Sequence, residues 1–174
     1  MEEIKDYQLP SWDVSFMKHV YLCAERSKDP RTKIGAVLVK DKRIISGGYN
    51  GFPIGVLDLS DRYNDRETKY KFIVHAEHNC VLTAAKLGIS TLNTTLFSQG
   101  IPCCDCSKSL IQGGVKEIVV HKQWQEYERQ FNWKKWIDSS KISEIMFNET
   151  GIKIRILDSK LNMSGYLDGK IISI

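Results

Sequence analysis

The chain lacks the features that would place it in a membrane or outside the cell. No apolar run approaches the ~18 consecutive residues that a membrane-spanning helix needs, and the polar, acidic stretch Met1–Pro10 predicts no signal peptide. Cysteine is limited to five residues, an odd number without the spacing of a disulfide framework. We therefore expect a protein of a reducing compartment, the cytoplasm.

A concentrated basic surface is also missing. The net charge is only +4, and Lys and Arg are scattered through the chain. A protein that binds nucleic acid normally gathers its basic residues in a patch or a stripe. The mild positive charge instead suits a small anionic substrate, so we expect neither a nucleic-acid partner nor a membrane partner.

What the chain does contain is sufficient for one domain with its own core. It has 174 residues, of which 42% are hydrophobic. We find no internal repeat, low-complexity tract or linker along it. The expectation is a single catalytic domain over residues 1–174.

The first part of the chain predicts a helix, a hairpin and an irregular stretch. Ser11 can cap a helix that runs to about Arg26. The apolar runs Ile34–Val39 and Arg43–Gly48 flank a short polar turn, which predicts a β-hairpin. The glycine-rich stretch Gly47–Gly55 then interrupts regular structure.

The segment Val56–Phe72 is long for a plain connection. Loops above about 12 residues are usually functional or disordered. Glu67 and Lys71 would form a favourable pair on a short helix. A solvated surface loop and a functional loop before His75 are both compatible with its sequence.

Helices and strands alternate in the second part of the chain. Apolar periodicity and turn residues predict, in order, the helix Ala76–Leu87, the strand Thr94–Ser98, the helix Cys104–Gln112, the strand Lys116–His121, a helical stretch over Gln123–Phe147 and a strand through Ile152–Ile156. A strand–helix–strand crossover implies parallel pairing in this half, with helices packed on the sheet. The turn signals Ser164-Gly165 and Asp168-Gly169 predict a further hairpin in the tail.

Two short motifs carry the chemistry, His75-Ala76-Glu77 and Pro102-Cys103-Cys104-Asp105-Cys106. His75, Cys103 and Cys106 offer one imidazole and two thiolates. Zinc accepts such a set at three tetrahedral corners and leaves the fourth for water, which marks a catalytic site. Bound zinc lowers the pKa of that water to roughly 7, and Glu77 can carry the water's proton to a leaving nitrogen.

Helix geometry supports this interpretation. Cys103 and Cys106 are three residues apart and would share a helix face, and Pro102 is well placed to start that helix. If both motifs open helices, the positive ends of the helix dipoles favour thiolates. The alternative is a surface C-x-x-C with an unrelated core histidine, which the order and combination of the residues make much weaker.

The motifs resemble those of zinc nucleobase deaminases, whose signature is H-x-E followed by P-C-x-x-C. The chain is most similar to the deoxycytidylate (dCMP) deaminase family, of virus and phage type, within the cytidine deaminase superfamily. The resemblance covers residues 10–156, leaves 157–174 unassigned, and includes the segments Ala24-Glu25-Arg26-Ser27, Lys33–Val39 and Gly48–Gly55.

The resemblance implies an α/β fold of three α/β/α layers, with a mixed central sheet and helices on both faces. It implies hydrolysis of dCMP to dUMP and ammonia for thymidylate synthesis, in the host cytoplasm if the protein is viral. His75, Cys103 and Cys106 would bind one Zn²⁺ per chain. Glu77 would protonate the ring N3 and then the leaving amine while activated water attacks C4.

Contacts to the nucleotide are also implied by the resemblance. The backbone near Ala76 would touch the base, and Asn50 would hold the sugar hydroxyl with its amide. Arg26 and Ser27 would lie near the 5′-phosphate, which the planar fork of arginine binds well. Trp124 falls near an aromatic that relatives place beside the nucleotide. A surface cation at a helix end and a core tryptophan are the competing interpretations of Arg26 and Trp124.

Members of this family are typically hexamers that dCTP activates and dTTP inhibits. The resemblance implies an effector site in the glycine-rich stretch, with the candidate residues Gly48, Tyr49, Gly51, Phe52 and Gly55. We expect His78 not to be a fourth ligand, because that would close the water position. Cys104 is one residue past Cys103 and faces elsewhere, so we expect it to be a packed thiol.

Other functions remain as alternatives. The substrate could be dCTP, CMP or deoxycytidine, since the zinc motif is shared by the whole superfamily. A deaminase that acts on adenosine in transfer RNA would normally require a clear basic surface. A non-catalytic nucleotide sensor would not need Glu77, and a structural zinc module would normally use four protein ligands.

Overall fold

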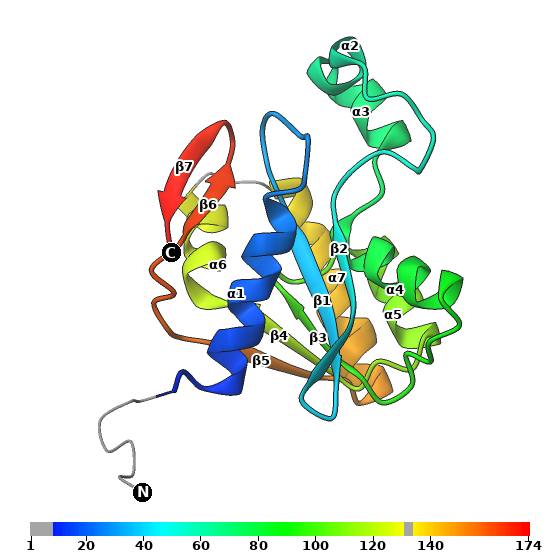
Figure 1. The fold of residues 1–174 in the computed structure, drawn as a ribbon, viewed down its shortest axis with the longest axis vertical. Coiled ribbons are helices and arrows are strands. Elements are labelled where there is room, and N and C mark those ends of the chain that lie inside the picture. The colour runs from blue at the N-terminus through cyan, green and yellow to red at the C-terminus, as the bar shows by residue number, and fades with distance from the viewer. Residues whose placement is uncertain (1–8, 131–133) are drawn as a thin grey trace, which may run out of the picture.

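The computed structural model describes residues 9–130 and 134–174, in which a five-stranded mixed sheet lies between helices (Figure 1). The strand order is β2-β1-β3-β4-β5. The antiparallel pairs join β1 (Gly35–Lys40) to β2 (Arg43–Tyr49) and to β3 (Thr95–Ser98). In the second half, β3, β4 (Glu117–His121) and β5 (Lys153–Leu157) run parallel. The predicted mixed sheet with a parallel second half is confirmed.

Alternation along the strands divides the interior into two clusters. On β1, Val37 and Val39 point to one face and Ala36 and Leu38 to the other. The first face is covered by α1 (Trp12–Ala24) and α6 (Lys122–Gln130), and the second by α4 (Ala76–Lys86), α5 (Cys104–Gln112) and α7 (Lys134–Thr150). The predicted layers, with helices on both faces, are therefore present.

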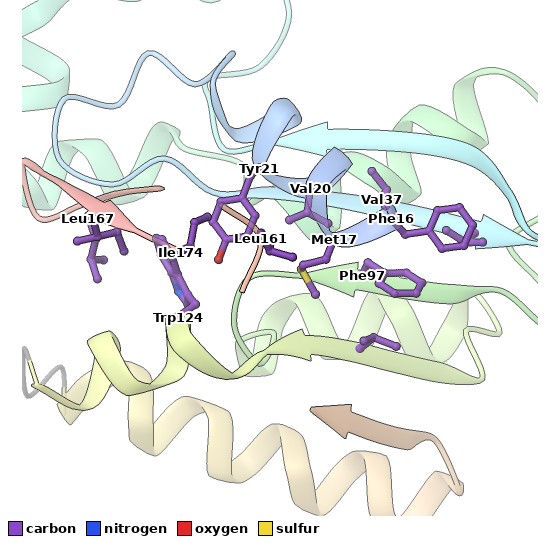
Figure 2. Packing of buried hydrophobic residues seen from close by; sticks show 13 residues of the cluster. Phe16, Met17, Val20, Tyr21, Val37, Phe97, Trp124, Leu161, Leu167 and Ile174 are labelled. Atoms are coloured by element: carbon purple, nitrogen blue, oxygen red, sulfur yellow. The ribbon is translucent and has the colours of Figure 1, made fainter. Parts of the chain in front are cut away.

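The first cluster packs α1 against the sheet. Figure 2 shows Phe16, Met17 and Val20 of α1 lying over Val37 of β1 and Phe97 of β3. These five side chains are at most 6% exposed. Burying a large apolar side chain contributes roughly 1.5–3 kcal/mol, so this face fixes α1 and with it the loop that follows.

Local signals explain where the first elements begin and end. The Ser11 hydroxyl accepts a hydrogen bond from the Val14 N–H (3.3 Å) and caps α1 as predicted. Asp41 and Lys42 adopt positive φ in the two-residue turn between β1 and β2. The hairpin prediction is confirmed. Helix α1 ends at Ala24, slightly before the predicted Arg26.

The long segment before His75 contains two short helices, α2 (Ser60–Asn64) and α3 (Arg66–Phe72), that project from the body (Figure 1). The Asp65 carboxylate accepts a hydrogen bond from the Thr68 N–H (2.8 Å) and caps α3. The rings of Tyr63 and Phe52 stack with centroids 4.2 Å apart. The segment is therefore a helical arm that is anchored on the glycine-rich stretch.

The tail forms a separate two-stranded sheet of β6 (Ser164–Leu167) and β7 (Lys170–Ser173). The turn at Asp168-Gly169 is confirmed, with positive φ at both residues. The turn predicted at Ser164-Gly165 is wrong, because both residues lie in β6. Gly165 allows close packing, since a Cβ there would make tight contacts of 3.3 Å with the rings of Tyr21 and Trp124.

The predicted helical stretch over Gln123–Phe147 corresponds to most of α6 and α7. Its residues 131–133 lie outside the described part of the chain. Among the residues that the structure describes, no helix is both long and apolar enough to cross a membrane.

Candidate active site

The two motifs open two neighbouring helices, as predicted. His75 is the N-cap residue of α4, and Cys103 is the N-cap residue of α5. Pro102 comes just before the cap and does not occupy the first helical position that the sequence suggested. Cys106 follows on the first turn of α5, on the face that carries Cys103. The donor atoms therefore lie at the positive ends of two helices, where thiolates are favoured.

The three donor side chains converge on one point. The Nδ1 atom of His75 lies 3.3 Å from Sγ of Cys103 and 3.5 Å from Sγ of Cys106. All three ligand atoms lie within 4.8 Å of one another. The hydrogen bond from Cys106, and then the imidazole of His75, lower the pKa of Cys103 to about 4. These neighbours favour the thiolate form of Cys103, and a nitrogen with two sulfurs is a donor set that zinc prefers.

Glu77 lies beside this donor set without belonging to it. Its side chain is buried, and Oε1 accepts a hydrogen bond from the Ser98 hydroxyl (3.0 Å). The other oxygen, Oε2, lies 3.7 Å from Sγ of Cys106. Burial raises the pKa of Glu77 above its ordinary value. A carboxyl group so placed can exchange a proton with a molecule bound next to the three donors.

A cavity of about 300 Å³ opens onto this site. Its wall includes His75, Ala76, Glu77 and Cys103, and also three basic residues, Arg31, Arg66 and Lys69. Arg66 begins α3, whereas the other end of that helix leads to His75, so the guanidinium group and the donor set are separated along the arm. The cavity therefore combines a metal-type donor set with cationic groups that suit an anion.

The remaining wall residues come from distant parts of the chain. They are Asp29, Thr32, Ile34, Asn50, Tyr63, Asn64, Tyr70, Ile73, Gly100, Ile101, Trp124, Glu128, Trp136 and Asp168.

Three of the predicted substrate contacts line the cavity: Ala76, Asn50 and Trp124. The amide of Asn50 is already engaged, because Oδ1 accepts from the Ile34 N–H (2.8 Å) and Nδ2 donates to the Thr32 carbonyl (2.9 Å). Asn50 thus organises the loop before β1 as well as facing the cavity. Trp124 is fully buried in the first cluster and also lines the cavity, so its core position is confirmed and its contact with the nucleotide stays a prediction.

Two predicted contacts are not brought to the cavity. Arg26 is exposed, and neither it nor Ser27 lines the wall. The Ser27 hydroxyl donates to the Asn50 carbonyl (2.8 Å) and accepts from the Asp29 N–H (3.2 Å), so it supports the loop from behind. The predicted phosphate contact of Arg26 and Ser27 stays a prediction. Arg31 and Arg66, which the sequence did not single out, are the arginines at the wall.

The five candidate effector residues also lie away from this cavity wall. A Cβ at Gly48 would lie 2.4 Å from the Ala76 carbonyl oxygen, so Gly48 lets β2 pack directly on α4. Gly51 forms a backbone bridge with Val74, Tyr49 is 42% exposed, and Phe52 stacks on the arm. Gly55 adopts a φ of +86°. The effector role of Gly48, Tyr49, Gly51, Phe52 and Gly55 stays a prediction.

Besides Arg31 and Arg66, three further wall residues belong to no motif: Glu128, Trp136 and Asp168. The rings of Trp136 and His75 are 5.4 Å apart, and Asp168 sits in the turn of the tail hairpin. His78 is not part of the donor cluster. Cys104 is half-buried, and its backbone N–H donates to the Ser139 hydroxyl (2.9 Å).

Sequence comparison adds an independent line of evidence. Residues 10–122 match the family described as the cytidine and deoxycytidylate deaminase zinc-binding region. The chain is 31% identical over 146 residues to a protein of Aliivibrio fischeri named "Uncharacterized deaminase in luxG 3'region", covering 84% of this chain and 93% of that protein. It is also 31% identical over 152 residues to the human deoxycytidylate deaminase, covering 83% and 78% of the two chains.

A solved structure has a similar fold over most of the chain. The dCMP deaminase of the cyanophage S-TIM5, in complex with dCMP and dUMP, superposes with a TM-score of 0.63 and 27% sequence identity. The match covers 87% of this chain and all of the phage protein.

Proposed function

Because this chain belongs to the cytidine and deoxycytidylate deaminase family, we propose that it hydrolyses dCMP to dUMP and ammonia. The observation that carries this proposal is the convergence of His75, Cys103 and Cys106 beside the Glu77 carboxyl in one cavity. The deoxycytidylate deaminases among its relatives, and the phage enzyme with dCMP and dUMP, support the substrate.

We propose that His75, Cys103 and Cys106 hold one zinc ion per chain. Their imidazole nitrogen and two sulfurs match the preference of zinc for soft donors, and the three atoms lie close enough to share one ion. Zinc bound there would supply an activated water at neutral pH.

Glu77 carries the protons in this proposal. Its carboxylate, oriented by Ser98, accepts a proton from the attacking water. It delivers this proton to ring N3. It then takes the second proton from the hydroxyl group that the water leaves at C4 and delivers it to the amine, which departs as ammonia. Burial excludes bulk water from Glu77 and raises its pKa, which suits a group that must both accept and release a proton near neutral pH.

We further propose that Arg31 and Arg66 bind the 5′-phosphate. Both arginines line the cavity, one from the loop after α1 and the other from α3. Arg31 forms only a long, exposed ion pair with Asp168 (3.7 Å). Lys69 is less available, because its ammonium group is buried against Asp29 at 3.0 Å. Arginine binds phosphate through two oxygens at once, which favours the two arginines for this role.

The first prediction concerns this phosphate contact. Arg66→Ala is expected to raise KM for dCMP about ten- to a hundredfold, since it removes charge-assisted hydrogen bonds. The kinetics of deoxycytidine, which has no phosphate, should not change. Steady-state assays with both substrates measure the difference, and Lys71→Ala on the same helix is the control. An equal loss with both substrates would remove Arg66 from the phosphate site.

The second prediction concerns the metal ligands. Cys103→Ser and Cys106→Ser are each expected to lose most bound zinc and to lower the melting temperature, because metal binding and folding are coupled. Zinc per chain is measured after dialysis, together with thermal unfolding. Cys104→Ser, between the two, should keep both values. Stoichiometric zinc in either ligand variant would contradict the assignment.

Regulation, assembly and location complete the proposal. We propose activation by dCTP, inhibition by dTTP and a hexameric assembly, as the resemblance of the sequence motifs to phage-type dCMP deaminases implies. The exposed apolar side chains of Ile142, Ile145 and Ile156 support an additional contact surface. The cytoplasm is the proposed location, because free thiolate ligands need a reducing compartment.

The test is a parallel assay of dCMP, CMP, deoxycytidine and dCTP, each with and without added dCTP or dTTP as effector. Selective turnover of dCMP is the expected result, and a response to the triphosphates would support regulation. Turnover only of another cytosine compound would keep the zinc chemistry and discard dCMP as substrate. A zinc-loaded protein that converts none of them would favour a nucleotide sensor.

A further inference from the structure

Glu128 is an acidic wall residue to which the deamination mechanism gives no role. It lies on α6 and lines the same cavity as His75 and Glu77. Its Oε1 accepts a hydrogen bond from the indole N–H of Trp124 (2.9 Å). Trp124 is fully buried, so this bond fixes the carboxylate on a rigid part of the core.

The carboxylate rests on the backbone of Gly100. A Cβ at Gly100 would lie 2.9 Å from Oε1 and 3.0 Å from Oε2, so a larger residue there would push the carboxylate out of this position. Gly100 follows shortly after Ser98, whose hydroxyl binds Glu77. The Glu128 carboxylate is therefore part of the cavity wall that Gly100 and Trp124 also form.

Within the described residues no direct ion pair compensates the charge of Glu128, and Arg129 only partly offsets the effect of burial on its pKa. Among the side chains that the structure describes, none forms an ion pair with Glu128, and Oε2 has no hydrogen-bond donor. Burial raises the pKa of Glu128 to about 7, which agrees with an acidic group that is poorly solvated. Glu128 is half-buried, so its charge is partly removed from water, which has a cost that a bound partner would offset. A glutamine would satisfy the Trp124 N–H equally well, so the indole alone does not require a carboxylate.

The chemistry of the substrate limits what that partner can be. At neutral pH the nucleoside part of dCMP has two kinds of hydrogen-bond donor, the amine at C4 and the 3′-hydroxyl. The amine belongs at the Glu77 end, where it leaves as ammonia. For an acceptor on another part of the wall, the 3′-hydroxyl of the sugar is the remaining donor.

We propose that Glu128 is a specificity-determining residue that accepts a hydrogen bond from the 3′-hydroxyl of the deoxyribose, with Trp124 as its positioning residue. This inference rests on the proposed function and adds a second sugar contact to Asn50. Oε1 keeps its bond to the indole, and Oε2 receives the hydroxyl.

The experiment compares dCMP with its 2′,3′-dideoxy analogue, which lacks only that hydroxyl. In the wild-type protein, kcat/KM should be about ten- to a hundredfold higher for dCMP, the range for a hydrogen bond to a charged group. Glu128→Gln should lower kcat/KM for dCMP and leave that of the analogue unchanged, so the ratio collapses. Glu126→Gln, an exposed neighbour on α6, is the matched control and should keep the wild-type ratio.

Several outcomes would overturn the proposal. A wild-type protein that does not distinguish the two nucleotides has no residue that recognises the hydroxyl. Equal losses on both nucleotides in Glu128→Gln would indicate a general structural role, and thermal unfolding identifies a variant that fails to fold. If Glu128→Gln fails to fold, Glu128→Asp is tested in its place. This variant keeps the charge but shortens the side chain by one methylene, and the same collapse of the ratio is expected.

Failure of the proposed function would give a different result from failure of the Glu128 proposal. If the wild-type protein converted neither nucleotide, dCMP deamination would be excluded. Calorimetry would then give Kd values for dUMP and its dideoxy analogue in the wild type and in Glu128→Gln. A Kd ratio between the two nucleotides that collapses in the variant would support the role of Glu128, and an unchanged ratio would exclude it.

Discussion

Replacing Glu77 by Gln is expected to lower kcat by about 10⁴-fold, the upper end for a single acid–base group. The carboxyl group handles several proton transfers in the proposed reaction, and an amide can perform none of them. The three donors do not include Glu77, and an amide can keep a hydrogen bond to Ser98. Steady-state turnover of dCMP measures the loss, while zinc content and the melting temperature should stay near wild type.

Two further measurements make this result specific. Ser98→Ala should lower kcat by a much smaller factor, because it loosens the orientation of Glu77 and leaves the carboxyl group in place. Glu67→Gln, on the exposed side of the arm, should have no effect. Normal turnover by Glu77→Gln would exclude the proposed proton transfers, whatever the zinc content.

The largest expected loss of stability follows from Lys69→Met. Lys69 and Asp29 form an ion pair whose side chains are 8% and 3% exposed. Removing one partner of a buried pair typically costs about 3–5 kcal/mol, because the other charge stays buried without compensation. We therefore expect the free energy of unfolding, measured by urea denaturation, to fall by that amount.

The control and the double variant separate charge from packing. Lys71→Met on the same helix removes an exposed charge and should change the free energy of unfolding by less than about 0.5 kcal/mol. Adding Asp29→Asn to Lys69→Met removes the uncompensated charge and should recover part of the loss. If the double variant were as unstable as the sum of the single variants, the two residues would be energetically independent.

The same ion pair also organises the cavity. The Asp29 carboxylate accepts hydrogen bonds from the backbone N–H groups of Arg31 (2.8 Å) and Thr32 (3.2 Å). Breaking the pair should thus disturb both the arm and the loop that carries Arg31. A raised KM for dCMP is expected in the same variants.

The reactive centre could be predicted from sequence because its parts are local. His75 and Glu77 are two residues apart, and Cys103 and Cys106 are three apart, so spacing alone fixes their relative placement once each motif opens a helix. The hairpin and the parallel strands followed from periodicity for the same reason. The motifs and the strand patterns are each determined by residues that are close together in the sequence.

The rest of the cavity is not local. Arg31, Arg66, Glu128 and Asp168 come from four separate elements, and nothing in their sequence surroundings distinguishes them from surface charges. The structural meaning of a glycine in the sequence is ambiguous as well. A glycine in a turn and a glycine under a close packing contact look alike in sequence, so Gly165 suggested a turn although it lies in a strand beneath Trp124.

The tail hairpin bears on how the protein reaches its working state. The Lys33 N–H donates to the Tyr166 carbonyl (3.0 Å), and the Gly169 N–H donates to the Arg31 carbonyl (2.7 Å). The Asp168 N–H reaches the Thr32 hydroxyl across 136 sequence positions. Contacts between such distant residues form slowly, because a long loop must close first. A ribosome-bound chain would thus contain His75, Cys103 and Cys106 long before the cavity is complete, because the wall that Arg31 and Asp168 help to form would be assembled only after synthesis of the tail.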